Sequence, residues 1–120
     1  MLAGYGCMQP ETRKYLWDAV AAIDLVRRFT SGKLLEDYLS DELLRSAVER
    51  QSEIVGEALS QMARIDPETA GRVPELRRII AFRNILAHGY GEVKDEAVWD
   101  ILSIDMPALR EVLTALLEAG

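Results

Sequence analysis

Apolar residues recur at intervals of three and four along most of the chain, and this spacing limits the possible folds more than any other feature. The first series begins after Pro10, which suits the first turn of a helix, and ends before Gly32, which suits a helix exit. Its members are Leu16, Ala19, Val20, Ile23 and Val26. Strand-type alternation and internal repeats are absent. The sequence therefore predicts an all-α fold, an antiparallel bundle of four to five helices with short connections.

The middle of the chain predicts one long helix and one short helix. A turn at "LLEDYL" is expected to lead to Ser40, which suits the N-cap of the long helix because Asp41 and Glu42 would lie in its first turn. In "DPETAG", Asp66 is expected to cap a short helix that has the proline at its first position and the glycine at its exit. The apolar stripe of the long helix is Leu44, Ala47, Val48, Val55, Ala58 and Met62.

Proline and glycine residues set the predicted boundaries of the remaining helices. Pro74 is expected to open a helix that Gly89 closes, and a further helix should start near Asp95. Pro107 should break or kink this further helix, and Asp105 should cap the part that follows. The final apolar stripe is Leu109, Val112, Leu113, Leu116 and Leu117.

Length and composition indicate one globular domain. The chain has 120 residues, of which 49% are hydrophobic and 28% charged. We expect a flexible N-terminal extension over residues 1–9 and the helical domain over residues 10–120. Cys7 is the only cysteine, which excludes an internal disulfide and suits a reducing compartment. We expect neither a signal peptide nor a membrane span, so the predicted location is cytoplasmic.

The charge of the chain is unevenly distributed. The formal net charge is -6, which argues against general nucleic-acid binding because phosphate repels an acidic surface. Residues 72–94 nevertheless carry five basic and two acidic side chains, a net charge of +3 against -9 for the remainder. Chance clustering on a solvated helix face explains this excess as well as a binding surface does. The basic residues are Arg72, Arg77, Arg78, Arg83 and Lys94.

Arg83 lies where an apolar residue is expected. On a helical wheel of about 100° per residue with Leu76 at zero, Arg83 lies at about 340°, inside the apolar arc. Asn84 and His88 lie at about 80° and about 120°, together at one edge of this arc. Because a buried unpaired charge is very costly, either Arg83 has a buried partner or the arc faces a cleft. The arc consists of Leu76, Ile79, Ile80, Phe82, Leu86 and Ala87.

Purely structural roles are available for these polar and aromatic residues. Gln51 lies amid the apolar stripe of the long helix and could hydrogen-bond Arg83 across the bundle. His88, the only histidine, could simply stabilise the C-terminal end of a helix. Trp17 and Trp99 could stack on nucleic-acid bases, although they suit a role as core anchors better. Periodicity alone favours these structural roles over chemistry.

The segment "RNILAHGY" resembles the R-N-x-x-x-H-x-Y signature of the HepT-like ribonuclease toxins, a branch of the HEPN superfamily. Arg83, Asn84, His88 and Tyr90 match this signature without departure. The stretches "KYLWDAV", "EDYLSDELLRSAVERQSEIVGEAL" and "VWDIL...DMPALREVL" are also similar to that family, so the likeness covers residues 14–117. The resemblance implies a HEPN-like helical bundle that forms a two-fold homodimer.

The same resemblance implies an endoribonuclease that acts on RNA without a metal or another cofactor. Cleavage through the substrate 2′-hydroxyl needs a base, an acid and positive charge beside the phosphorane. His88 would act as base or acid, Arg83 would hold the phosphate, and Asn84 would orient the imidazole or the substrate. Because one chain supplies one histidine, two chains would share a cleft. Possible RNA-binding residues are Arg77, Arg78 and Lys94.

The resemblance also implies regulation within a type VII toxin–antitoxin system. An MntA-like minimal nucleotidyltransferase antitoxin would attach AMP to Tyr90, which lies between two glycines that leave the phenol accessible. Packing of the tyrosine over the helix end is the structural alternative. A different class of function, which the acidic balance favours, is a non-catalytic helical module that binds a nucleotidyltransferase partner or a nucleotide.

Overall fold

The structure is a computed structural model that describes residues 8–88 and 95–119, with residues 85–88 and 95 described by their backbone alone. Within these ranges the chain forms helices and no strand, as predicted. The elements in chain order are α1 (Pro10–Thr30), α2 (Leu35–Ser40), α3 (Glu42–Ile65), α4 (Pro67–Ala70), α5 (Leu76–His88), α6 (Asp95–Asp100), a π-helical segment (Ile101–Asp105) and α7 (Met106–Ala119).

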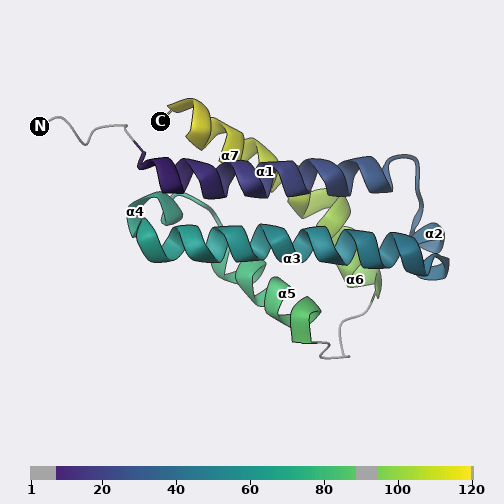
Figure 1. Cartoon of the computed structure of the whole chain (residues 1–120). Helices are drawn as coiled ribbons and strands as arrows, with labels where there is room; N and C mark the ends of the chain where they lie inside the picture. The colour runs from purple at the N-terminus through teal and green to yellow at the C-terminus, as the bar shows by residue number, and fades with distance from the viewer. Residues whose placement is uncertain (1–7, 89–94, 120) are drawn as a thin grey trace, which may run out of the picture.

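Two long antiparallel helices, α1 and α3, form the centre of the bundle (Figure 1). Helix α7 packs on α1, whereas α5 packs on α3. Figure 1 shows that α5 runs obliquely to α3 and that its C-terminal end projects away from the central pair. The helix that carries the R-N-x-x-x-H signature therefore lies at the edge of the bundle.

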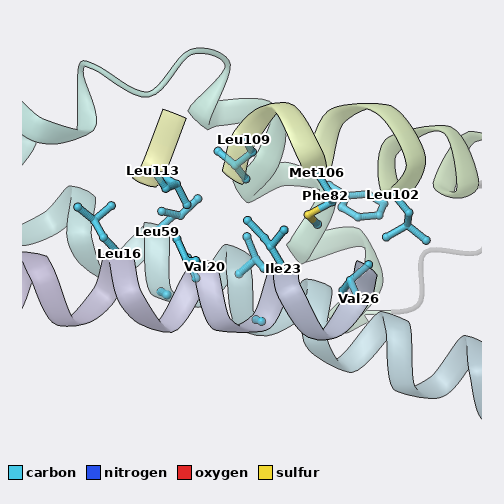
Figure 2. Packing of buried hydrophobic residues seen from close by; sticks show 14 of the residues in the cluster. Leu16, Val20, Ile23, Val26, Leu59, Phe82, Leu102, Met106, Leu109 and Leu113 are labelled. Atoms are coloured by element: carbon cyan, nitrogen blue, oxygen red, sulfur yellow. The ribbon is translucent and has the colours of Figure 1, made fainter. Parts of the chain in front are cut away.

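The hydrophobic core lies between α1, α3 and α7. Every apolar residue predicted for α1 is buried, and so is the predicted stripe of α3 apart from the half-buried Ala47. Figure 2 shows side chains from the three helices meeting in this cluster, with Leu16 and Val20 near Leu59 and Leu113. Full burial of one such aliphatic side chain contributes about 1.5–3 kcal/mol, so this contact dominates the stability of the fold.

The predicted start of the long helix is wrong by one residue. Asp41, rather than Ser40, caps α3. Its Oδ1 accepts hydrogen bonds from the backbone N–H groups of Leu43 at 3.0 Å and Leu44 at 3.1 Å. Ser40 instead ends α2, where its hydroxyl donates to the carbonyl oxygen of Glu36 at 2.9 Å. The segment that the sequence predicts as a turn thus forms a short helix, which takes Ser40 away from the cap position.

The predicted effects of the two prolines in the second half of the chain differ in their outcome. Helix α5 begins at Leu76 rather than at Pro74, because Glu75 has a φ of 60° that no right-handed helix can contain. Pro107 does not end the last helix, but an irregular π-helical segment lies directly before it and runs into α7. Asp105 does not cap α7, because it lies inside this segment.

The two tryptophans differ in their surroundings. Trp99 packs against the core, and its ring centroid lies 5.4 Å from that of the fully buried Tyr38, which confirms its role as an anchor. The same prediction is wrong for Trp17, which is 54% exposed. Trp17 follows Leu16 directly, so it is rotated by about 100° from the buried stripe of α1.

Asp66 joins the beginning of α1 to the short helix α4. Its carboxylate caps α4, as predicted, by accepting a hydrogen bond from the Thr69 backbone N–H at 3.0 Å. It also accepts hydrogen bonds from the hydroxyls of Thr69 at 2.7 Å and of the buried Thr12 at 3.0 Å. Burial raises the pKa of Asp66, but these hydrogen bonds and the charge of Arg72 outweigh it and lower the pKa.

Replacement of Asp66 is expected to destabilise the fold in a pH-dependent way. The pKa of Asp66 is lower in the folded protein than in the unfolded chain, where it is about 3.9. The ionised carboxylate therefore stabilises the fold at pH values above the unfolded pKa, and this stabilisation is lost as the pH falls through the folded pKa. At pH 7, Asp66→Ala should lower the free energy of unfolding by about 1–3 kcal/mol, measured by urea denaturation.

Asp66→Asn is the control, because asparagine also caps helices but does not titrate. The difference in unfolding free energy between the wild type and Asp66→Asn should shrink between pH 6 and pH 3. A difference that stays constant over this range would show that the carboxylate charge contributes no stability.

Candidate functional site

Helices α3 and α5 approach each other closely at Gly56 and Arg83. A Cβ atom placed on Gly56 would lie 2.2 Å from Cβ and 2.5 Å from Cγ of Arg83. Real atoms do not approach so closely, so no other residue fits at position 56 without a shift of α5. The absence of a side chain lets the aliphatic stem of Arg83 lie directly on α3.

Arg83 forms its hydrogen bonds beyond this crossing point. Its Nη2 donates to Oε2 of Glu57 at 2.8 Å, and its Nη1 donates to Oδ1 of Asn84 at 2.9 Å. Its Nε is buried and has no hydrogen-bond partner among the described residues. The hydrogen bond to Gln51 that the sequence allows is not formed, because Glu57 takes its place. The side chain as a whole is 31% exposed, so Arg83 is neither sealed in the core nor fully solvated.

A groove of about 620 Å³ borders Arg83. The helical wheel allowed either a buried partner for Arg83 or a cleft beside it, and the groove favours the cleft. The groove runs between α1 and α3, and Arg83 is the residue that α5 contributes to it. Small residues, among them Ala22 and Ala58, lie beside amides such as Gln51 and Gln61 in its lining. This combination of a hollow, amide groups and a guanidinium suits a polar ligand that carries a negative charge.

The acidic side chains of the groove are each paired with a base. Asp18 pairs with Lys14 at 2.9 Å, and Glu53 pairs with Arg50 at 3.7 Å. The pair of Glu57 with Arg83 completes the set. The groove is therefore close to electrically balanced, and it does not share the strong negative charge of the whole chain.

The apolar arc predicted for α5 is only partly covered. Phe82 is buried, whereas Leu76, Ile79 and Ile80 are half-buried. The reason is the position of α5 at the edge of the bundle, where α3 covers one side of the helix. Ala81 and Asn84, on other faces of α5, are exposed.

The structure describes some of the predicted site residues completely, one by its backbone alone, and others not at all. Arg83 and Asn84 are brought together by their hydrogen bond. His88 is the last residue of α5, so its backbone lies on the same helix, and its side chain is outside the description. Tyr90 and Lys94 fall outside the described residues, as does Gly89, which is expected to end α5.

The two remaining candidate RNA contacts are exposed on the first turn of α5. Arg78 forms ion pairs with Glu75 and, at 4.0 Å, with Asp105, so its charge is already balanced. Arg77 has no ion pair within the described part of the chain. Of the two, Arg77 is the better available cation for a phosphate.

The described ranges contain neither a candidate metal site nor a membrane-spanning helix. No group of three or more histidine, cysteine, aspartate or glutamate side chains in residues 8–84 and 96–119 is arranged to hold a metal ion. None of the described helices is both long and apolar enough to cross a bilayer.

Comparison with known proteins identifies the family. A sequence profile described as Ribonuclease HepT-like matches residues 20–116. The chain belongs to the HepT-like ribonuclease family. It is 34% identical over 107 residues to a Thermococcus cleftensis protein named "Probable ribonuclease HepT", with 86% of this chain and 93% of that protein covered. No solved structure matches the chain.

Another relative is longer than this chain. A Methanocaldococcus jannaschii protein named "Gamma-glutamylcyclotransferase and putative RNase" is 27% identical over 111 residues. The match covers 92% of this chain but only 50% of that protein. The chain thus spans about half the length of this relative and nearly all of the Thermococcus protein.

Sequence reasoning did not identify Gly56 and Glu57 as parts of the site. A signal was present, since a glycine inside a long helix costs about 1 kcal/mol relative to alanine and often marks a close approach of two backbones. In "IVGEAL" that glycine is followed directly by the acid that binds Arg83. The ion pair itself was not predictable, because it depends on the register between α3 and α5.

Replacement of Gly56 is expected to disturb Arg83. Gly56→Ala gains helix propensity but places a methyl group 2.2 Å from the Cβ of Arg83, so α5 must move. We expect a net loss of about 1–3 kcal/mol in the free energy of unfolding. Gly71→Ala is the matched control, since its Cβ would lie 3.4 Å from its nearest neighbour. Equal stability of the two variants would contradict the close contact.

Proposed function

We propose that this HepT-like protein is a metal-independent endoribonuclease that cleaves RNA through the substrate 2′-hydroxyl. The observation that carries the proposal is the placement of Arg83 at a groove, with a partly exposed side chain and more N–H donors than Glu57 and Asn84 accept. His88 ends the same helix. A phosphate-binding guanidinium supplies the positive charge that this reaction requires, and an imidazole can serve as its base or its acid.

In this mechanism each signature residue has a separate task. Arg83 donates charge-assisted hydrogen bonds to the phosphate oxygens, which stabilises the extra negative charge of the phosphorane. One His88 side chain removes the proton from the 2′-hydroxyl, and another returns a proton to the leaving 5′-oxygen. Asn84 keeps the guanidinium in place through its Oδ1. The products are a 2′,3′-cyclic phosphate and a free 5′-hydroxyl.

A two-fold homodimer would supply the second histidine. The support is twofold: the chain has one histidine, and α5 packs on α3 while residues on its other faces are exposed. Contact between two copies of α5 near their C-terminal ends would cover these faces and place His88 of one copy beside the Arg83 groove of the other. RNA would enter this cleft beside Arg77, whose charge no described residue balances, with Arg78 and Lys94 as further candidates.

Substitutions in the signature are expected to abolish cleavage. His88→Ala and Arg83→Ala should each lower cleavage of total RNA by at least about a hundredfold while the far-ultraviolet circular dichroism stays helical. Wild-type cleavage should persist in EDTA. Sequencing of the new ends should find the cyclic phosphate or its hydrolysis product.

Arg72→Ala is the control for loss of a basic side chain, because Arg72 pairs with Glu68 on the surface and lies outside the groove. It should cleave like the wild type. Cleavage by a well-folded His88→Ala protein would exclude the proposed chemistry. A light-scattering mass of a monomer for the active protein would exclude the shared cleft.

We further propose that the protein is the toxin of a type VII toxin–antitoxin system that acts in the cytoplasm. A minimal nucleotidyltransferase antitoxin of the MntA type would attach AMP to Tyr90, two residues after His88. Each AMP adds a phosphate that would compete with RNA for Arg83 and a base that would fill the cleft. The support for this step is the match of "HGY" to the family signature.

Tyr90→Phe should separate toxicity from neutralisation. This variant keeps the ring but lacks the hydroxyl that would receive AMP, so it should arrest growth in the presence of the antitoxin. The wild-type toxin should gain mass in AMP-sized steps when it is co-expressed with the antitoxin and should no longer arrest growth. Silencing of Tyr90→Phe by the antitoxin, without any adduct on the wild type, would show inhibition by binding alone.

A further inference from the structure

Glu57 holds Arg83 in place, and the cleavage chemistry above gives it no task. Its Oε2 accepts a hydrogen bond from Nη2 of Arg83 at 2.8 Å across the α3–α5 contact. Its other oxygen, Oε1, accepts a hydrogen bond from Nε2 of Gln61 at 3.2 Å, one turn later on α3. The carboxylate is therefore oriented by its own helix and presents one oxygen to α5.

The Arg83 side chain is fixed at three points along its length. Its Cβ and Cγ lie on the backbone of α3 at Gly56, where no side chain intervenes. Glu57 binds one terminal nitrogen of the guanidinium, and Asn84 binds the other. A free arginine side chain has about 2 kcal/mol of rotamer entropy to lose when it binds a phosphate. In this arrangement much of that loss has already occurred before a ligand arrives.

The contact with Glu57 leaves Arg83 able to bind an anion. A guanidinium has five N–H donors, and Glu57 and Asn84 each accept one of them. The Nε–H is buried and has no partner in the described part of the chain, so the donors left for an anion are the second N–H groups of the two terminal nitrogens. Glu57 is itself 50% exposed, so water screens its negative charge. The carboxylate thus restrains the direction of the guanidinium and leaves one N–H group on each terminal nitrogen for an anion.

We propose that Glu57 is a positioning residue, which orients the Arg83 guanidinium toward the scissile phosphodiester of the substrate. The consequence for catalysis rests on the proposed ribonuclease function, whereas the ordering of Arg83 does not. A guanidinium aimed in advance stabilises the phosphorane better than a mobile one, because the protein need not reorganise during the reaction. Gly56 contacts the aliphatic stem of Arg83, and Glu57 binds its guanidinium.

The first experiment tests the ordering without any substrate. The side-chain N–H signal of Arg83 is assigned by its disappearance in Arg83→Lys, and its mobility is measured by nitrogen-15 relaxation. In the wild type this signal should report a rigid, slowly exchanging group. Glu57→Ala should make it mobile, and Glu57→Gln, which keeps an acceptor oxygen, should lie in between. Equal rigidity in Glu57→Ala and the wild type would overturn the proposal, whether or not the protein cleaves RNA.

Glu68→Ala is the matched control. Glu68 pairs with Arg72 instead of Arg83 at the surface and lies outside the groove. Its removal changes the net charge by the same amount, so it should leave the Arg83 signal rigid. The pair of Glu57 with Arg83 is partly exposed, and such pairs contribute little to stability. The melting temperatures of the two variants should therefore match that of the wild type.

The second experiment tests the consequence for catalysis with a short fluorescent RNA that contains a mapped cleavage site. Glu57→Ala should lower kcat by roughly tenfold to a hundredfold and leave KM within about a factor of two, because the charge of Arg83 remains. Glu57→Gln should recover part of the loss, and Glu68→Ala should show none. In the Arg83→Ala background, Glu57→Ala should cause no further loss, since it acts through the arginine.

The two experiments separate the possible failures. Normal or increased kcat in Glu57→Ala would overturn the positioning role and show a carboxylate that competes with phosphate. A wild-type protein that cleaves no RNA, but in which Glu57→Ala mobilises Arg83, would refute the proposed function and leave the ordering of the side chain established.

Discussion

The close contact of Gly56 with Arg83 sets the register between α3 and α5, and the polar site depends on that register. Helix α5 packs on α3 at the edge of the bundle, where it lacks the cover that α1 and α3 give each other. An alanine at position 56 would already overlap the arginine stem. With glycine there, the guanidinium reaches the next residue of α3, Glu57, instead of the solvent.

The periodicity of apolar residues was sufficient to predict the helices that build the core. In α1 the predicted apolar positions are all buried, whereas in α7 Leu109, Leu113 and Leu117 are buried and Val112 and Leu116 are half-buried. The two helices pack against one another, so the pattern predicts most of the burial. Pro107 shows the limit of local rules, because the chain stays helical there through a π-helical segment where a break or a kink was expected. Ser40 and Asp41 compete for the same cap, and only the end of α2 decides between them.

The sequence predicted the site less completely than the core, because it gave the position of Arg83 but not its partner. The wheel placed Arg83 inside the apolar arc and left two alternatives, a buried partner or a cleft, because a charge on an apolar face is too costly to bury alone. In the structure Arg83 is 31% exposed, pairs with Glu57 and borders a groove. Its partner was not predictable in the same way. Gln51 lies on the apolar stripe of α3, whereas Glu57 lies on the polar side, where an acidic residue usually signifies nothing more than solvation. Only the three-dimensional crossing of the helices shows which of the two the arginine meets.

The spacing of Arg83 and His88 is itself an argument for two chains. Five residues on a regular helix separate two Cα atoms by about 7.5 Å along the axis and about 140° around it. Such positions face largely different directions, so a single α5 is poorly suited to surround one phosphate with both residues. In the proposed homodimer, a two-fold axis beside α5 would remove this difficulty, because the arginine of one copy could then lie opposite the histidine of the other.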